Sequence, residues 1–345
     1  MPLVLAHPPA LTKADEAALS DLYRRGTPQN TLRAYERDLL YISAWKDAAF
    51  GQALAWPEAE AVALRFVLDH CRDLSAARDE AAQVAQSLIE AGLRKSLACP
   101  AAATLDRRIA SWRAFHRMRN LASPFEAPLI AQARGKARRA AARPRAPKSA
   151  HPITRAVLEE MLATCDGTLR GLRDRALLML GFASGGRRRS EITGLMRADV
   201  SLDDFAAKGV VWLRLLETKT TAKGVAPKLV LKGRAARALI SWIEAAEIED
   251  KALFRPVSKG DRALPRQLHP DAVRQIVAYR LALAGYPAGF AAPHGLRSGF
   301  LTQAALDGAP IQAAMRLSLH RSVVQAQRYY DDVEITDNPA TDLLG

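Results

Sequence analysis

The sequence GGRRRSEITGL occupies residues 185–195 and places two glycines directly before three arginines. The glycines indicate a tight turn, and the polar residues after them indicate the start of a short helix. Backbone groups and guanidiniums can approach an anion closely at such a turn, and Glu191, one helical turn beyond Arg188, can orient the Arg188 side chain. Two interpretations stay open: an anion site, or a capped helix with a solvated arginine cluster.

A lysine follows at the tip of a predicted β-hairpin. Segments 209–216 and 228–231 are rich in β-branched and aromatic residues, which favours two short antiparallel strands. Lys219 lies in the turn between them, where its ammonium could give a proton to a leaving oxygen, as a permanently ionised arginine could not easily do. The alternative is an ordinary surface lysine at a hairpin tip.

Two further motifs combine histidine with arginine or tyrosine. His294 and Arg297 stand three residues apart at the predicted start of a helix, so they share one face near backbone dipoles that favour an anion. His320 precedes Tyr329 by about two and a half helical turns. Taken alone, the first pair could arise by chance, and adjacent Tyr329 and Tyr330 could be packing or capping residues.

The first half of the chain reads as helical. Between residues 13 and 121, apolar residues recur at three-to-four spacing, and the stretch 31–45 carries aromatic residues that fit the core-facing side of one helix. Another helix begins near Thr104 and carries several arginines around Trp112 and Phe115. Those arginines fit either a solvated basic face or a DNA contact.

Between residues 134 and 155 eight arginines and lysines occur without an acidic residue, and three prolines interrupt any helix. This composition predicts a linker, which either follows a phosphate backbone or serves only solubility. Beyond it, Thr154 is predicted to cap a helix that runs to Cys165, and residues 172–182 read as a strongly apolar helix.

Composition narrows the classes of function. The 345 residues exceed one typical hydrophobic core, so two domains are expected, and 50 Lys and Arg against 36 Asp and Glu give a net charge of +14. A polyanion is the expected partner, with nucleic acid ahead of an anionic membrane surface. No apolar run is long enough for a membrane span and no signal peptide is recognisable, which favours a cytoplasmic protein. The three cysteines have no metal-ligand spacing, so buried, reduced thiols are expected.

The order of these motifs resembles the tyrosine recombinase, or phage integrase, family and in particular its Xer-type members. Residues 188–191 are similar to that family's first arginine box, Lys219 to its hairpin lysine, residues 294–297 to its second box, and His320 and Tyr329 to its final histidine and nucleophile. Residues 30–38 resemble the start of its helical core-binding domain. Two positions depart from the family pattern, because Leu319 replaces a common glycine and Arg187 stands where leucine is more usual.

The resemblance implies a mostly α fold that forms a C-shaped DNA clamp. A helical core-binding domain (residues 1–133), a basic linker (134–152) and an α+β catalytic domain with a small antiparallel sheet (153–345) are expected. It also implies the catalytic residues Arg188, Lys219, His294, Arg297, His320 and Tyr329, with Tyr330 as the alternative nucleophile.

The implied reaction is cleavage and rejoining of double-stranded DNA at a specific site through a 3′-phosphotyrosyl bond. Guanidiniums neutralise the phosphate, so no metal, cofactor or ATP is expected. A synaptic tetramer is implied, with accessory proteins or a second recombinase as further partners. Two alternatives stay open: a relaxase similar to type IB topoisomerases, and a non-catalytic DNA-binding regulator on the same scaffold.

Overall fold

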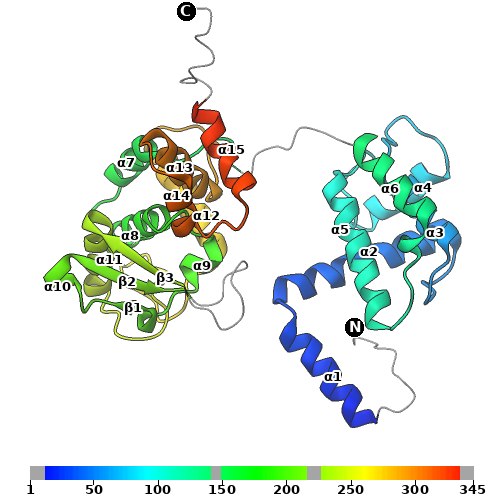
Figure 1. Ribbon diagram of the computed structural model, residues 1–345, viewed down its shortest axis with the longest axis horizontal. Helices are drawn as coiled ribbons and strands as arrows, with labels where there is room; N and C mark the ends of the chain where they lie inside the picture. Colours follow the sequence, from blue (N-terminus) through cyan, green and yellow to red (C-terminus); the bar gives the residue numbers. More distant parts are fainter. Residues whose placement is uncertain (1–11, 141–148, 216–226, 335–345) are drawn as a thin grey trace, which may run out of the picture. The chain divides into compact units, whose positions relative to one another are not determined.

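The computed structural model describes residues 12–140, 149–215 and 227–334, which belong to two compact units, Met1–Arg145 and Ala146–Gly345 (Figure 1). In its described residues the first unit is entirely helical, and the second combines helices with a small antiparallel sheet. The predicted fold class, mostly helical with one small antiparallel sheet, is therefore confirmed.

The first unit packs its helices around an aromatic core. Trp45, Phe66 and Trp112 are fully buried, and Phe66 meets both tryptophan rings edge to face at centroid distances of 4.9 and 5.4 Å. Tyr41 is buried beside Trp45, so the aromatic stripe of residues 31–45 is core, as predicted. The helices and the 3-10 turn are α1 (Lys13–Gly26), α2 (Gln29–Phe50), α3 (Glu60–Asp69), α4 (Glu80–Glu90), α5 (Ala102–Met118), η1 (Pro124–Glu126) and α6 (Pro128–Ala140).

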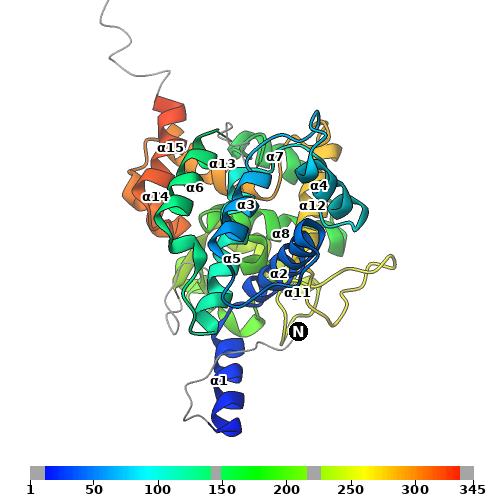
Figure 2. The same ribbon diagram turned by 90° about the vertical axis from the view of Figure 1, so that its right-hand side faces the viewer.

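Helix α1 differs from the others of this unit, because it buries none of its residues. It extends away from the remaining helices in both views (Figures 1 and 2). Thr12 caps it, and the Thr12 hydroxyl accepts a hydrogen bond from the backbone of Asp15 at 3.2 Å. Local capping thus defines where this helix begins.

Several basic residues of α5 are structural, which neither interpretation of its basic face anticipated. The guanidinium of Arg108 lies 3.2 Å from the centre of the Tyr41 ring, and that of Arg119, just after the helix, lies 3.9 Å from the Trp56 ring. Both arginines are buried. Such stacking holds both guanidiniums within the unit, so these two arginines do not belong to an exposed basic face.

The segment predicted to be a linker is partly structured at both of its described ends. Residues 134–140 form the last turns of α6, because the first proline of the segment comes only at residue 144 and Ala, Arg and Lys favour helix. Residues 149–153 belong to the second unit, where the backbone of Ile153 donates to the carbonyl of Gly295 at 2.9 Å. A Cβ on Gly299 would lie 1.8 Å from the Ile153 oxygen, so glycine permits this approach.

The second unit contains the predicted hairpin within a three-stranded sheet of order β1-β2-β3. Strands β2 and β3 pair antiparallel, with Val211 opposite Leu231 and Leu213 opposite Leu229, and these four side chains face the core. Its elements are α7 (Arg155–Ala163), α8 (Leu169–Ala183), α9 (Arg189–Thr193), η2 (Arg197–Asp199), β1 (Val200–Ser201), α10 (Phe205–Lys208), β2 (Val210–Arg214), β3 (Lys228–Lys232), α11 (Gly233–Ala245), α12 (Pro270–Leu283), α13 (His294–Leu306), α14 (Ile311–Ser318) and α15 (Val323–Glu334).

Helix α8 is the centre of this unit, as its apolar sequence predicted. It packs against α11 on one side and α13 on another, and α13, α14 and α15 pack together beyond it (Figure 1). Thr154 is the N-cap of α7, as predicted, but its side chain makes no capping hydrogen bond. Thr168 makes that bond for α8, where its hydroxyl accepts from Gly171 at 3.1 Å.

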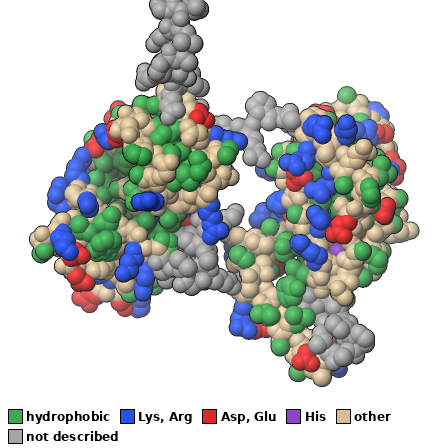
Figure 3. All heavy atoms as spheres, in the orientation of Figure 1, with side chains coloured by type: hydrophobic (Ala, Val, Ile, Leu, Met, Phe, Trp, Pro, Cys, Tyr) green, Lys and Arg blue, Asp and Glu red, His purple; other side chains and the backbone are tan. Residues whose placement is uncertain are grey.

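On the face shown in Figure 3, lysine and arginine side chains are spread over both units with acidic side chains among them. The positive excess of the chain is therefore not concentrated in a single patch on that face. No helix in the described part of the chain is long and apolar enough to span a membrane.

Candidate active site

The turn that joins α8 to α9 brings three segments of the second unit together. Gly185 and Gly186 have φ values of +95° and +71°, which glycine adopts without strain. A Cβ on Gly185 would lie 2.4 Å from the backbone of Leu317, and a Cβ on Gly186 would lie 2.2 Å from the Cα of Arg297. The two glycines therefore allow α13 and the end of α14 to approach the arginine turn directly.

Arg297 lies buried in α13 at the point where these segments meet. Its Nη1 donates to the carbonyl of Gly186 at 3.2 Å, and its Nη2 lies 3.0 and 3.1 Å from the two ring nitrogens of His320. The Nδ1 of His320 is also 2.8 Å from the hydroxyl of Ser318. A guanidinium and an imidazole thus form one polar surface.

Tyr329 and Tyr330 are adjacent in α15 but have different surroundings. The half-buried Tyr329 places its hydroxyl 3.5 Å from Nε2 of His294, and its ring centre is 6.5 Å from that of His320. The buried Tyr330 packs against α13 and α14 and donates its hydroxyl hydrogen to the carbonyl of Ala309 at 3.0 Å. Of the two tyrosines, only Tyr329 faces the histidines.

Arg188 stands at the N-cap of α9, where Glu191 holds it. The Glu191 carboxylate accepts from Nη1 of Arg188 at 2.6 Å and from the Arg188 backbone at 3.2 Å. This is the orientation that the three-residue spacing predicted. The side chain of Arg188 remains 34% exposed, so its guanidinium can also reach an external anion.

Positive charge accumulates in this site, and the pKa values reflect it. Burial, together with the charges of Arg187 and Arg188, lowers the pKa of Arg297 to about 10. Burial and then the neighbouring Arg297 lower the pKa of His320 to about 4, so its ring is neutral near pH 7. Because bringing like charges together costs free energy, an anion bound here would relieve the repulsion.

Five of the six residues predicted from sequence therefore lie together. Arg297 contacts His320, Tyr329 contacts His294, and the charge of Arg188 acts on both Arg297 and His320. Lys219 lies outside the described residues. Arg187, which is buried beside the other arginines, was not among the predicted site residues. Its departure from the family pattern was the one sequence signal that marked it.

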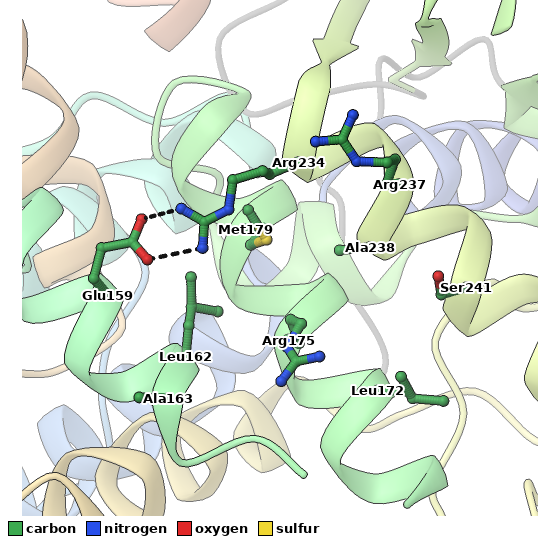
Figure 4. Close-up of a pocket in the computed structure, with 10 residues that line it drawn as sticks. All are labelled: Glu159, Leu162, Ala163, Leu172, Arg175, Met179, Arg234, Arg237, Ala238 and Ser241. Atoms are coloured by element: carbon green, nitrogen blue, oxygen red, sulfur yellow. Dashed lines mark hydrogen bonds and ion pairs between the residues drawn. The ribbon is translucent and has the colours of Figure 1, made fainter. Parts of the chain in front are cut away.

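The described residues hold no candidate metal site, and a basic cavity in the second unit lies apart from this site. The described residues contain no cluster of three or more His, Cys, Asp or Glu side chains that could hold a metal ion. A cavity of about 490 Å³ lies among α7, α8 and α11, where Arg234 pairs with Glu159 at 2.7 and 2.8 Å and Arg175 and Arg237 complete a basic lining (Figure 4). None of the five predicted residues that the structure describes lines that cavity.

The structure has a helical unit and a second unit with a three-stranded sheet, and its site places a tyrosine beside clustered arginines and histidines. These are the features that the resemblance to tyrosine recombinases implied, and comparison with known families agrees. The model of the phage integrase family matches residues 152–334. The chain belongs to this family, which confirms the resemblance seen in the sequence.

Curated relatives include an integrase/recombinase xerD homolog of Selenomonas ruminantium, 32% identical over 173 residues. That match covers 48% of this chain and 49% of the relative, so the chain spans about half the length of this relative. The tyrosine recombinase XerD of Xanthomonas axonopodis pv. citri is 28% identical, with 88% of each chain covered. Among solved structures, the Tn1549 transposon integrase in complex with transposon right end DNA shares the fold, with a TM-score of 0.58 at 15% identity over 90% of this chain and 92% of that one.

Proposed function

We propose that the protein is a site-specific DNA recombinase that cleaves and rejoins double-stranded DNA through a covalent bond between Tyr329 and a DNA phosphate. One observation carries the proposal: the Tyr329 hydroxyl lies 3.5 Å from His294 in a site where Arg297 and His320 are in contact. The names of the relatives, which are integrases and tyrosine recombinases, support the same reaction.

The arginines bind the phosphate in this proposal. Negative charge spreads over the non-bridging oxygens as the new bond to phosphorus forms, and it must be neutralised. Arg297 and Arg188 supply guanidiniums that bind two oxygens each, and His320 adds a hydrogen bond to the same group. Because two fixed cations do this work, the proposed step uses no metal or cofactor.

Tyr329 is the nucleophile of the proposed cleavage step. The Tyr329 oxygen attacks phosphorus, and its proton passes to Nε2 of His294, which is 3.5 Å away and comes closer when the substrate binds. The bond from phosphorus to the 5′ oxygen breaks, and Lys219 protonates that oxygen. The product is a 3′-phosphotyrosyl bond, a polarity that follows from the family resemblance. Its energy lets a 5′-hydroxyl of another strand reverse the step without ATP.

Substrate and assembly follow from the same resemblance. We propose that the substrate is duplex DNA carrying a specific recombination site, held through basic side chains of the chain. Four copies assembled on two sites would exchange strands, with accessory proteins or a second recombinase as further partners. Phosphate contacts of this kind make binding fall steeply with salt concentration.

A nicked-substrate experiment tests the proposal. A binding site is first enriched from random duplexes with the full chain, and the enriched duplex is then prepared with a nick just beyond each candidate cleavage position, so that the released fragment diffuses away and the adduct accumulates. We expect a protein–DNA adduct that survives denaturation and maps by mass spectrometry to Tyr329. Failure of wild-type protein to form any adduct on its enriched site would contradict the proposal.

Assays with the same purified protein separate the two alternative functions, a relaxase and a non-catalytic DNA-binding regulator, from a recombinase. Relaxation of a supercoiled plasmid without exchange between two sites would indicate an enzyme similar to type IB topoisomerases. Tight binding without an adduct on any nicked duplex would indicate a non-catalytic regulator.

A further inference from the structure

Arg187 is a buried cation that links two segments of the candidate active site. Only 3% of its surface is exposed, although it lies in the turn between α8 and α9. Its Nη2 donates to the carbonyl of Leu317 at 2.6 Å and to that of Gly185 at 3.4 Å, and its Nη1 lies 3.7 Å from the Glu191 carboxylate. One side chain therefore joins the arginine turn to the last turn of α14.

The end of α14 needs such a partner. Leu317 belongs to the last turn of this helix, and the carbonyls of a last turn receive no hydrogen bond from an N–H group of the same helix. Two residues later, Leu319 adopts the left-handed conformation, with φ +54° and ψ +40°, and this costs a leucine about 1–2 kcal/mol. Arg187 binds the orphan carbonyl of Leu317 and so helps to hold the strained turn.

The strained turn determines where His320 lies. His320 follows Leu319 directly, and its Nδ1 is 2.8 Å from the hydroxyl of fully buried Ser318. Its ring nitrogens reach Nη2 of Arg297 at 3.0 and 3.1 Å. If the carbonyl of Leu317 were released, the turn that places the His320 ring would lose its hydrogen bond from the Arg187 side chain.

We propose that Arg187 is a positioning residue, which binds the Leu317 carbonyl and thereby holds His320 against Arg297 and ready for the phosphate. The part that concerns the phosphate rests on the proposed recombinase function. The structural part does not, because it concerns the His320 turn in the protein without DNA.

The cost of this arrangement argues for a purpose beyond packing. Burial lowers the pKa of Arg187 to about 10, so the side chain is still charged near pH 7. Its Nε has no hydrogen-bond partner among the residues that the structure describes. A well-packed apolar residue often stabilises a buried position as well as an ion pair does, or better. The guanidinium offers what an apolar residue lacks, which is an Nη2 group that donates to two backbone carbonyls and an Nη1 group that faces the Glu191 carboxylate.

NMR titration of His320 without DNA is the first test. The His320 signal is identified as the one lost in His320→Ala. We expect Arg187→Met to raise the His320 pKa from about 4 toward its ordinary value of 6.5, because the ring leaves its buried place beside Arg297. Arg189→Met is the matched control, because Arg189 is 41% exposed and pairs with Asp271 on α12 instead. An unchanged titration in Arg187→Met would overturn the proposal.

Arg187→Lys separates position from charge and also serves if the methionine variant folds poorly. Lysine keeps the positive charge but ends in a single nitrogen, which cannot contact the Leu317 carbonyl and the Glu191 carboxylate together as Nη2 and Nη1 of Arg187 do. A positioning role predicts that the lysine variant raises the His320 pKa as the methionine variant does. If His320 titrates in the lysine variant as it does in wild type, then charge alone matters and the proposal is overturned.

Cleavage of the nicked duplex is the second test, made at saturating DNA. We expect Arg187→Met to form the Tyr329 adduct roughly 10- to 100-fold more slowly, which is the effect of a small misplacement of a reacting group, while DNA affinity stays near that of wild type. In a His320→Ala background the same substitution should cause no further loss, because both changes act through one group. Equal slowing in both backgrounds would overturn the proposal. If wild type forms no adduct, the recombinase function fails, and the titration still decides the role of Arg187 in holding His320.

Discussion

The hydroxyl of Tyr329 lies 3.5 Å from Nε2 of His294, although 35 residues separate them in the chain. Packing of α15 against α13 creates this contact. The next residue, Tyr330, points the other way and uses its hydroxyl on the carbonyl of Ala309. One helical position therefore decides which tyrosine can act as nucleophile and which belongs to the core.

Substitution of each tyrosine should give opposite results. Tyr329→Phe should abolish the covalent adduct on the nicked duplex and leave DNA affinity unchanged, because only the attacking oxygen is removed. Tyr330→Phe should still form the adduct, and should lose roughly 1 kcal/mol of unfolding free energy with its buried hydrogen bond. Adduct yield on a denaturing gel and chemical denaturation measure the two effects. An adduct in Tyr329→Phe that maps to Tyr330 would exchange their roles.

Lys219 is expected to protonate the leaving 5′ oxygen, and replacement of that oxygen in the DNA tests this role. Lys219→Ala should slow cleavage of ordinary DNA by about 100-fold or more, since the 5′ oxygen then departs without a proton. A substrate with sulfur in place of that bridging oxygen needs no proton, so the variant should cleave it nearly as fast as wild type does. Single-turnover rates on the two substrates provide the comparison. Equal slowing on both would assign Lys219 to binding instead.

The sequence was sufficient to predict the helical segments and the hairpin, because these depend on local periodicity and spacing. The set of site residues came from the resemblance to the family. The sequence did not predict that Arg108 stacks on Tyr41 or that Arg119 stacks on Trp56, since both pairs join helices or loops that are distant in sequence. Hydrophobic pattern indicates which face of a helix is buried but does not indicate which arginine will find an aromatic ring there. For this reason the sequence suggested that more of the basic residues in and just after α5 are exposed than the structure shows.

In the candidate site too, contacts within one helical turn could be predicted from the sequence, and contacts between distant segments could not. Spacing predicted that Glu191 orients Arg188, a contact within one helical turn. The contact of Arg297 with His320 depends on a left-handed Leu319, which sequence rules disfavour for leucine, and on the close approach of Gly185 to Leu317. Local rules fail at these positions because tertiary contacts hold the backbone in a conformation that the residue itself does not prefer.

The first unit should lose stability in mild acid because of His70. This buried ring is satisfied in its neutral form, in which Nδ1–H donates to the Phe66 carbonyl and Nε2 accepts from the Tyr41 hydroxyl, both at 2.7 Å. Burial lowers its pKa to about 3, against an ordinary value of 6.5. Between these two pH values the unfolded chain binds a proton that the folded chain does not, so stability falls as the pH falls, by up to about 1.4 kcal/mol per pH unit.

His70→Gln isolates this contribution, because glutamine can replace both hydrogen bonds and does not titrate. The unfolding free energy of wild type should fall more steeply than that of the variant between pH 6.5 and 4, as measured by urea denaturation at several pH values. His320, whose pKa is also depressed, contributes equally to both proteins and cancels in the comparison. Parallel pH profiles would mean that His70 does not stay neutral in the folded state.

The charge imbalance around Arg297 should make the site bind a small anion even without DNA. Burial and then the neighbouring arginines lower the pKa of Arg187, of Arg297 and of His320, and Glu191 is the carboxylate placed against these arginines. Sulfate is tetrahedral like the phosphate of DNA and carries two negative charges where a phosphodiester carries one. It should therefore raise the melting temperature of wild type more than sodium chloride does at the same ionic strength, while Arg297→Met should lose most of the difference.

Glu191→Gln removes the negative charge that lies against Arg187 and Arg188. Loss of a carboxylate whose side chain is only 7% exposed leaves the buried arginines without compensation and should destabilise the protein by about 3 kcal/mol. Sulfate should restore more stability to this variant than it adds to wild type, because the anion replaces the missing negative charge beside Arg188. Calorimetry with sulfate and chloride series on the three proteins measures both effects. A sulfate effect of the same size in wild type, Arg297→Met and Glu191→Gln would mean that sulfate binds elsewhere, and that the arginines do not form one anion site.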